Sequence, residues 1–174
     1  MPYSLRQNLN EVASVKDAIR LSEDEVKSRR LDEFRQRCQS LGIPMTPQRL
    51  SVLEAVLDLA CHPTADQVYN SLQTTQTRIS RATVYRTLEA LVEMEMITKT
   101  CHPGGVIRYD RRTEMHHHLV CLGCDAVIDV TDERLNELPI PDTTSLGFEV
   151  KDFRVQLRGL CRSCREKREE EERK

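Results

Sequence analysis

Two pairs of cysteines, each pair with two residues between its members, constrain most strongly what this chain can fold into. The pairs are Cys121/Cys124 and Cys161/Cys164, and 36 residues separate them. Two CxxC pairs at such a distance are typical of a tetrahedral structural zinc site, because each pair supplies two thiolates from one tight turn. Gly123, inside the first turn, is expected to relieve strain beside the ligands. Zinc held in this way would contribute directly to folding of the surrounding domain.

Other uses of the cysteines are weighed against this one. A redox-active dithiol also has CxxC spacing, but it is expected at the start of a helix in a βαβ unit, and the sequence indicates no such unit. The chain has seven cysteines, an odd number, and its N-terminus has no apolar leader, so a disulfide framework is not favoured. The scattered cysteines Cys38, Cys61 and Cys101 are interpreted as small, part-buried hydrophobic residues.

Without an apolar N-terminal leader, the chain is expected to be cytoplasmic, and its composition indicates an aliphatic core. Hydrophobic residues make up 39% of the chain, aromatic residues 4%, and tryptophan is absent. No apolar run approaches the roughly 20 residues needed to cross a bilayer, so no membrane association is expected. The formal net charge is −2, so DNA binding cannot be inferred from bulk charge and would need a local basic surface.

The first half of the chain has the periodicity of four amphipathic helices. Each has a hydroxyl residue where it is expected to begin, and these candidate N-caps are Ser22, Thr46, Thr64 and Ser80. Glu25 completes a capping box with the first of them, and Gly42 is expected to end that helix. Pro47 occupies the first helical position after the second cap.

After Met96 the period changes to that of strands. Residues 97–110 are predicted to form two short strands joined by a loop that contains Pro103, Gly104 and Gly105. The last three of these helices, followed by a β-hairpin, match the winged-helix arrangement. In that arrangement the last helix before the hairpin, which here starts near Ser80, enters the major groove of DNA.

The chain beyond the hairpin is predicted to be mostly β-structure. Strands are expected within 116–122 and 126–130, and one long strand over 147–161. A short helix capped by Thr131 lies between the second and third strands. The fold class is therefore α+β, with a second domain that begins just after Asp110.

Three consecutive histidines at the start of this second domain indicate another metal site. Successive side chains on a strand point to opposite faces, so His116 and His118 share one face while His117 and Cys121 share the other. The histidine pair therefore does not join the cysteine site, and histidine with carboxylate ligands suits iron(II) or manganese(II). The nearby candidates to complete the set are Asp110 and Asp129, and His62, just before the third predicted helix, is a further candidate. A histidine such as His62 at a helix start can equally be a cap, and Asp129 an ordinary polar strand residue.

Four segments of the chain together resemble the ferric uptake regulator (Fur) family. They are "HPTADQVYNSL", "SRATVYRTLEALVEMEMI", "HHHLVCLGC" and "GLCRSC", which occur in the family's order between Leu41 and Cys164. The resemblance implies a homodimeric, metal-dependent transcriptional repressor, not an enzyme, that binds a palindromic double-stranded DNA operator. It also implies an N-terminal winged-helix DNA-binding domain and a C-terminal α/β dimerisation domain. The expected organisation is an N-terminal extension over 1–21, the winged helix over 22–110, the metal-binding dimerisation domain over 111–165 and a charged tail over 166–174.

The resemblance also implies which residues bind the regulatory Fe²⁺ or Mn²⁺. These are the ligand positions of the family, which here are His62, Asp110, His116, His118 and Asp129. One ion would thereby join the DNA-binding half to the dimerisation half. Some iron sensors of the family have a further site, but the positions concerned are here Met115, His117, Asn136 and Phe153, so no third site is expected.

The branch of the family rests on fewer residues. Asp129, where iron sensors usually have Glu, resembles the peroxide-responsive (PerR) branch, in which iron(II) reacts with hydrogen peroxide and ligand histidines are oxidised. The matching histidines here are His62 and His116. Arg86 is instead typical of iron and zinc sensors, so an iron-responsive uptake regulator without peroxide sensing is the alternative.

Candidate DNA contacts lie on the helix that begins after Ser80 and around it. The residues expected to reach bases or nearby phosphates from this helix are Arg81, Thr83, Tyr85 and Arg86. Phosphate contacts are expected from Arg49, Lys99 and Arg108. Any one of these side chains could also be an ordinary solvated residue.

Two other classes of function are compatible with parts of the pattern. His116, His118 and an aspartate could hold a catalytic zinc with an open position, but HExxH is absent and no general base stands out. A zinc-ribbon interaction module would need only the four cysteines. The histidine and aspartate set favours the repressor over both, and no small organic substrate is expected.

Overall fold

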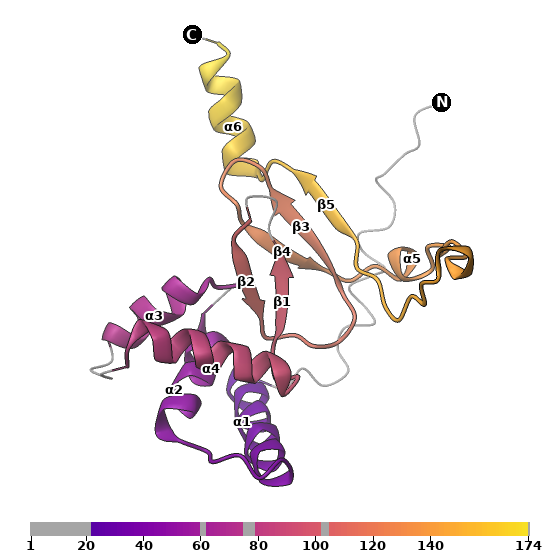
Figure 1. The fold of residues 1–174 in the computed structure, drawn as a ribbon. Coiled ribbons are helices and arrows are strands. Elements are labelled where there is room, and N and C mark those ends of the chain that lie inside the picture. The colour runs from indigo at the N-terminus through magenta and orange to yellow at the C-terminus, as the bar shows by residue number, and fades with distance from the viewer. Residues whose placement is uncertain (1–21, 60–61, 75–78, 102–104, 174) are drawn as a thin grey trace. The chain divides into compact units, whose positions relative to one another are not determined.

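The computed structural model describes residues 22–59, 62–74, 79–101 and 105–173, which are coloured in Figure 1. The chain divides into two compact units, Met1–Met45 and Thr46–Lys174. The predicted extension over 1–21, Cys61, Pro103 and Gly104 lie outside the described residues. Among the residues that are described, no helix has the length and apolar character required to cross a bilayer. The predicted division near Asp110 stays a prediction.

The first unit contains helix α1, Glu23–Ser40. The Ser22 hydroxyl accepts the N–H of Glu25, and the Glu25 carboxylate accepts the N–H of Ser22 at 2.7 Å, so the predicted capping box is confirmed. The helix ends where Gly42 adopts a φ of +64°, a left-handed conformation that glycine tolerates at little cost.

The second unit begins with helices α2 (Pro47–Asp58), α3 (Ala65–Thr74) and α4 (Arg81–Glu93). Each predicted cap is confirmed: Thr46, Thr64 and Ser80 accept backbone N–H groups of the first turn that follows. The three helices bury an aliphatic core made of Val52, Leu53, Val56, Val68, Leu72, Val84, Leu88 and Leu91. Each such side chain contributes roughly 1.5–3 kcal/mol by leaving water.

The wing follows these helices as predicted. Strands β1 (Thr98–Cys101) and β2 (Ile107–Asp110) pair antiparallel, with Thr98 opposite Asp110. The segment before α3 adds to the other edge of β2, because Thr64 bridges to Arg108 and the N–H of Tyr109 donates to the Pro63 carbonyl at 2.9 Å. This pairing fixes the entrance to α3 against the last residues of the wing.

The second unit also contains a three-stranded sheet (Figure 1). Strand β3 (His117–Cys121) is central, β4 (Val127–Val130) pairs with it antiparallel, and β5 (Gln156–Gly159) pairs with it in parallel. A 3₁₀ turn, η1, covers Thr144–Leu146, and helix α6, Arg162–Glu171, follows β5 within the charged C-terminal region.

Two predictions for this part were wrong. The long strand over 147–161 is reduced to Gln156–Gly159, because Gly147 turns into the left-handed region and the N–H of Val155 donates to the His117 ring at 3.1 Å instead of continuing a ladder. The short helix α5, Glu133–Asn136, is capped by Asp132 rather than Thr131. The Asp132 carboxylate accepts the N–H of Arg134 at 3.0 Å, and it also pairs with the Arg134 guanidinium.

Candidate metal centres

The four paired cysteines come together beyond the end of β3. Cys121 ends that strand, Cys124 lies in the turn to β4, and Cys161 and Cys164 stand at the start of α6. Their sulfur atoms all lie within 4.8 Å of one another. The parallel pairing of β3 with β5 causes this meeting, because it places Cys121 opposite Gly159, two residues before Cys161.

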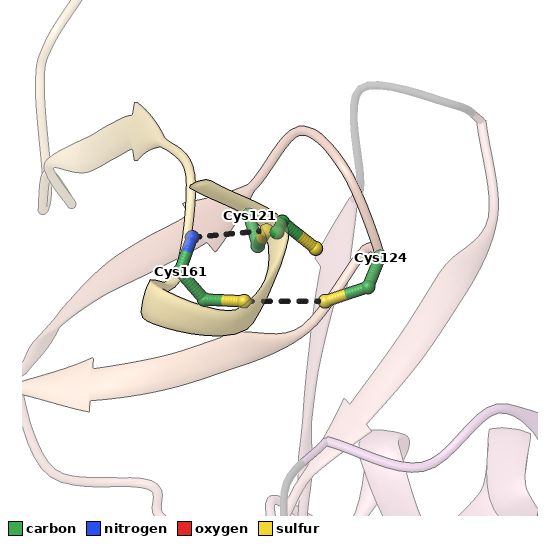
Figure 2. Close-up of side chains that lie close together, drawn as sticks. Cys121, Cys124 and Cys161 are labelled. Atoms are coloured by element: carbon green, nitrogen blue, oxygen red, sulfur yellow. Dashed lines mark hydrogen bonds between the residues drawn. The ribbon is translucent and has the colours of Figure 1, made fainter. Parts of the chain in front are cut away.

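The sulfur positions fit a tetrahedral ion. The Sγ atoms of Cys124 and Cys161 are 3.8 Å apart and face each other in Figure 2. Four thiolates at about 2.3 Å from one zinc ion would be separated by about 3.8 Å. A disulfide would need about 2.05 Å, and all four cysteines are free thiols. The spacing therefore supports a metal site rather than a pair of disulfides.

Backbone N–H groups favour ionisation of one of these cysteines. The N–H of Cys161 donates to the Cys121 sulfur at 3.2 Å, as Figure 2 shows, and the N–H of Gly123 donates to it at 3.4 Å. These contacts lower the pKa of Cys121 to about 6. The neighbouring Cys161 and Cys124 raise the pKa of Cys164 to about 12. Four thiolates in so small a volume need a cation to balance them.

Gly123 is required by space rather than by backbone conformation. A Cβ at this position would lie 2.9 Å from both Cβ and Sγ of Cys164. Its φ is not in the left-handed region, unlike that of Asp125 two residues later. The predicted importance of this glycine therefore holds, but the reason is the close approach of the second cysteine pair.

A second cluster joins three parts of the second unit. His62 precedes α3, Asp110 ends β2, and the hairpin of β3 and β4 brings in the rest of the cluster, which comprises His116, His118 and Asp129. His118 and Asp129 are direct partners in the antiparallel register, as the chain length between them predicted. One donor atom from each of the five residues lies within 4.8 Å of all the others.

The distances in this His/Asp cluster suit a single ion. Oδ2 of Asp110 lies 2.8 Å from Nε2 of His116, 3.2 Å from Nε2 of His62 and 3.5 Å from Nε2 of His118. Oδ1 of Asp129 lies 3.0 Å from His62, 3.6 Å from His116 and 4.0 Å from His118. An ion with bonds of about 2.1 Å separates neighbouring ligand atoms by about 3 Å and opposite ones by about 4.2 Å.

The donor atoms are buried and lack hydrogen-bond partners within the described part of the chain. These atoms are Nε2 of His62, Oδ2 of Asp110, Nε2 of His116, Nε2 of His118 and Oδ1 of Asp129. Buried polar atoms in proteins nearly always have a partner, so five orphans that face one another indicate an additional cation. The donors, three nitrogens and two oxygens, therefore fit a divalent transition metal.

Groups around the cluster prepare its members for this role. Nδ1 of His116 lies 2.8 Å from the Glu114 carbonyl, so the proton belongs on Nδ1 and the lone pair of Nε2 faces the cluster. Burial by itself raises the pKa of Asp110, but the nearby histidines and the Arg112 amide outweigh burial and hold that pKa below its ordinary value. Asp110 is therefore an anion, as a metal ligand must be.

Comparison with known proteins identifies the arrangement. The model of the ferric uptake regulator family matches residues 40–158, more than half of the chain. This chain belongs to the ferric uptake regulator family. Members of the family are dimeric, DNA-binding transcriptional regulators rather than enzymes.

Relatives from two branches of the family are similar to the chain. The ferric uptake regulation protein of Bacillus subtilis (strain 168) is 34% identical over 146 residues, which cover 81% of this chain and 98% of that protein. The peroxide-responsive repressor PerR of Staphylococcus aureus (strain Mu50) is 29% identical over 137 residues, covering 79% and 93%. The Helicobacter pylori Fur structure has a TM-score of 0.65 at 21% identity and covers 80% of this chain and 93% of that one. The family and the fold class are thus confirmed, while the two branches are not separated.

The third histidine of this Fur-family chain faces away from the His/Asp cluster. Nε2 of His117 lies 2.9 Å from Oδ1 of Asn136, and its Nδ1 accepts the N–H of Val155. Phe153 lies beside the ring, with 6.2 Å between centroids. Protein groups therefore engage both ring nitrogens, and the absence of a third metal site stays a prediction.

The predicted DNA contacts of the family's recognition helix lie along one side of α4. Tyr85 and Arg86 are exposed, whereas Val84, Thr87 and Leu88 are buried. Thr83 is half-buried and shares a hydrogen bond of 2.9 Å with the Ser80 hydroxyl.

Other predicted contacts have partners within the protein. Arg81 pairs with Asp66 and lies over the ring of Tyr69, at 4.7 Å from its centroid. Lys99 pairs with Glu89. The half-buried Arg49 lies in the first turn of α2, with its N–H on Thr46, and Arg108 donates to the His62 carbonyl at 3.1 Å.

Two residues around the metal centres were missed by the sequence reasoning. Glu114 acts through its backbone carbonyl, so no local pattern marks it. Arg112 follows Asp110 by two residues, and that proximity was the one available signal.

Proposed function

We propose that this chain is a metal-dependent repressor of transcription in which one regulatory ion links the wing and the start of α3 to the β3–β4 hairpin. The observation that carries the proposal is the set of five buried donor atoms that have no hydrogen-bond partner among the residues that the structure describes. His62 and Asp110 come from the part that would contact DNA, His118 and Asp129 come from the sheet, and His116 directly precedes β3. An ion in this site would join the two parts.

The two sites differ in the metal that they would hold. Cys121, Cys124, Cys161 and Cys164 would hold a structural Zn²⁺, because thiolates favour this ion. The His/Asp cluster would hold regulatory Fe²⁺ or Mn²⁺, because imidazole and carboxylate suit borderline and hard divalent ions. Bound iron(II) supplies electrons for cleavage of hydrogen peroxide.

The chain's own contacts explain how the regulatory site would influence DNA binding. His62 is followed by Pro63 and Thr64, which pair with β2, and then by α3. α3 packs directly against α4, and both helices bury apolar side chains in the same core. Loss of His62 from the cluster would release the entrance of α3, and the orientation of the recognition helix would no longer be fixed.

The sheet provides the surface for a second copy of the chain. Leu119 of β3 stands opposite Ile128 of β4 and Leu157 of β5, so the three side chains form one row across the sheet. Their exposed fractions are 41%, 50% and 42%. Such an apolar row on a regulator of a dimeric family is best explained by burial in a homodimer. Two recognition helices would then fit half-sites of a palindromic operator about 34–36 Å apart.

On the DNA side, Tyr85 and Arg86 of α4 would read the major groove, with Thr83 beside them. Arg can bridge O6 and N7 of guanine, and Tyr can contact a thymine methyl group or a phosphate. Phosphate contacts would come from Arg49, Arg81 and Lys99. To reach a phosphate, Arg81 would leave its partner Asp66, and Lys99 would leave its partner Glu89.

For the signal, we propose peroxide sensing through oxidation of His62 or His116. One oxygen atom passes from hydrogen peroxide to an imidazole carbon, its hydrogen is replaced by hydroxyl, and water is released. An oxidised imidazole ring no longer serves as a metal ligand through its nitrogen, so the His/Asp cluster loses its ability to bind the ion. The alternative is an iron-responsive regulator without peroxide sensing, which Arg86 and the 34% identity to the Bacillus subtilis protein favour.

The test of metal dependence is a gel shift with a self-complementary AT-rich duplex, with zinc-loaded protein and with or without added Mn²⁺. Metal-dependent retention supports the repressor. Equal binding without Mn²⁺ contradicts it and favours an interaction module.

The test of the signal is mass spectrometry after peroxide treatment of the iron(II)-loaded protein. The peptides that contain His62 or His116 are expected to gain the mass of one oxygen atom with iron(II) and not with manganese(II). Without this gain, the chain is reassigned to iron sensing.

A further inference from the structure

Each carboxylate of the His/Asp cluster divides its two oxygens between the cluster and one neighbouring residue. Asp110 points Oδ2 at the histidines, while its Oδ1 accepts the backbone N–H of Arg112 at 2.8 Å. Asp129 points Oδ1 at the histidines, while its Oδ2 lies 3.4 Å from Nη1 of Arg112. A single residue therefore contacts the outer oxygen of both aspartates.

Arg112 is itself held in place at the end of the wing. Its carbonyl accepts the Thr98 hydroxyl at 3.4 Å, which ties the residue to the start of β1. Its guanidinium reaches from there to β4, and thus from the wing side of the cluster to the sheet side. Neighbouring Arg111 points elsewhere and donates to the Leu57 carbonyl at 2.9 Å.

We propose that Arg112 is a positioning residue that makes each aspartate a ligand through one oxygen only. This inference rests on the proposed regulatory metal site. A carboxylate whose second oxygen is engaged by an N–H group cannot turn to offer both oxygens to an ion. With three histidine nitrogens and one oxygen from each aspartate, the protein supplies five donor atoms, one fewer than an octahedral ion accepts.

The number of donor atoms matters because it decides what else can reach the ion. If Asp129 bound through both oxygens, the protein would fill all six positions of an octahedron. With Arg112 in place, the five donor atoms would leave a bound ion accessible to a small molecule such as peroxide. The side chain of Arg112 therefore determines access to the site without being a ligand.

The test uses Co²⁺ as the probe, added to full-length protein whose cysteine site is already filled with zinc. Ligand-field absorption of Co²⁺ weakens as its coordination number rises, and its affinity is measured in the same titration. For Arg112→Met we expect weaker absorption per bound ion and an affinity lower by about 10-fold, the lower end of what outer-shell changes cost. Arg111→Met is the matched control and is expected to leave both readouts unchanged.

A double-mutant cycle with Asp129 distinguishes positioning from a general effect of charge or folding. In an Asp129→Ala background, Arg112→Met should cause no further loss of Co²⁺ affinity, because the guanidinium no longer has a ligand to hold. An equal loss in both backgrounds, or an unchanged spectrum of Arg112→Met, would overturn the inference. Arg112→Lys should recover part of the wild-type spectrum, since an ammonium can still engage one oxygen.

Failure of the proposed function gives a different result from failure of this inference. The first case is that zinc-loaded wild-type protein and its His118→Ala variant bind the same amount of Co²⁺. The regulatory site itself is then absent, and both proposals are wrong. If wild type binds Co²⁺ but Arg112→Met behaves like Arg111→Met, only the role of Arg112 is wrong.

Discussion

At the scale of single residues, three consecutive histidines have two roles because their side chains alternate. His116 and His118 point to the His/Asp cluster, and His117 between them is fixed by Asn136 and Val155. The alternation of a strand predicted this division, and the register of β3 with β4 then placed Asp129 beside His118.

A glycine substitution tests the packing of the cysteine site. In Gly123→Ala the new Cβ would meet Cys164 at 2.9 Å, so we expect substoichiometric zinc and a loss of stability of about 1–3 kcal/mol. Zinc content by mass spectrometry and urea unfolding measure the two effects. Gly159→Ala is the control, because nothing described lies within 4 Å of its added Cβ. Full zinc occupancy and unchanged stability in Gly123→Ala would contradict the geometry.

The thiol pKa values predict how zinc binding depends on pH. Without metal, Cys121 has a pKa of about 6 and Cys164 one of about 12, so at pH 7 the first is largely a thiolate and the second a thiol. Zinc must displace the remaining protons, and its apparent affinity should therefore rise with pH above 6. Calorimetry in buffers of different ionisation enthalpy should show release of more than one proton per zinc. Proton release near zero at pH 7 would mean that the thiols are already ionised.

At the scale of elements, the helices were predictable because their caps are local. Ser22, Thr46, Thr64 and Ser80 each act on an N–H group within three residues. The extent of β5 was less predictable, because groups far away along the chain determine it. The Val155 N–H is taken by a histidine 38 residues earlier, and this shortens β5.

The members of the His/Asp cluster were less predictable than the helix caps but more predictable than the extent of β5. Spacing alone indicated His116 and His118, but only the family resemblance selected His62 over its reading as a helix cap. The contact that brings His62 to Asp110 is the pairing of Pro63 and Thr64 with β2, which no local pattern announces.

A substitution in β2 tests that pairing. Arg108 donates to the His62 carbonyl, so Arg108→Met should loosen His62 and weaken Mn²⁺ binding by about 10-fold while zinc content stays constant. Lys99→Met, in the other strand of the wing, is the control and should leave Mn²⁺ affinity unchanged. The same affinity for both variants would show that this contact does not position His62.

At the scale of the whole molecule, the proposed regulation requires two copies of the chain and one shared surface. The exposed row of Leu119, Ile128 and Leu157 lies on the sheet that also supplies His118 and Asp129 to the His/Asp cluster. The same small sheet would therefore hold the dimer together on one side and the regulatory ion on the other.

A charge placed in this row tests the dimer. Ile128→Glu should shift the protein to monomer, because a carboxylate buried in an apolar interface costs several kcal/mol. Sedimentation equilibrium gives the mass, and Val106→Glu, an equally exposed position in the wing, is expected to remain dimeric. An unchanged mass for Ile128→Glu would place the interface elsewhere.

The most direct measurement of the central claim is anomalous diffraction at the manganese edge from crystals of the zinc-loaded protein soaked in Mn²⁺. The account predicts one manganese peak at about 2.0–2.3 Å from a donor atom of each of His62, Asp110, His116, His118 and Asp129. A manganese ion bound only by the sheet residues, with His62 and Asp110 out of reach, would contradict it.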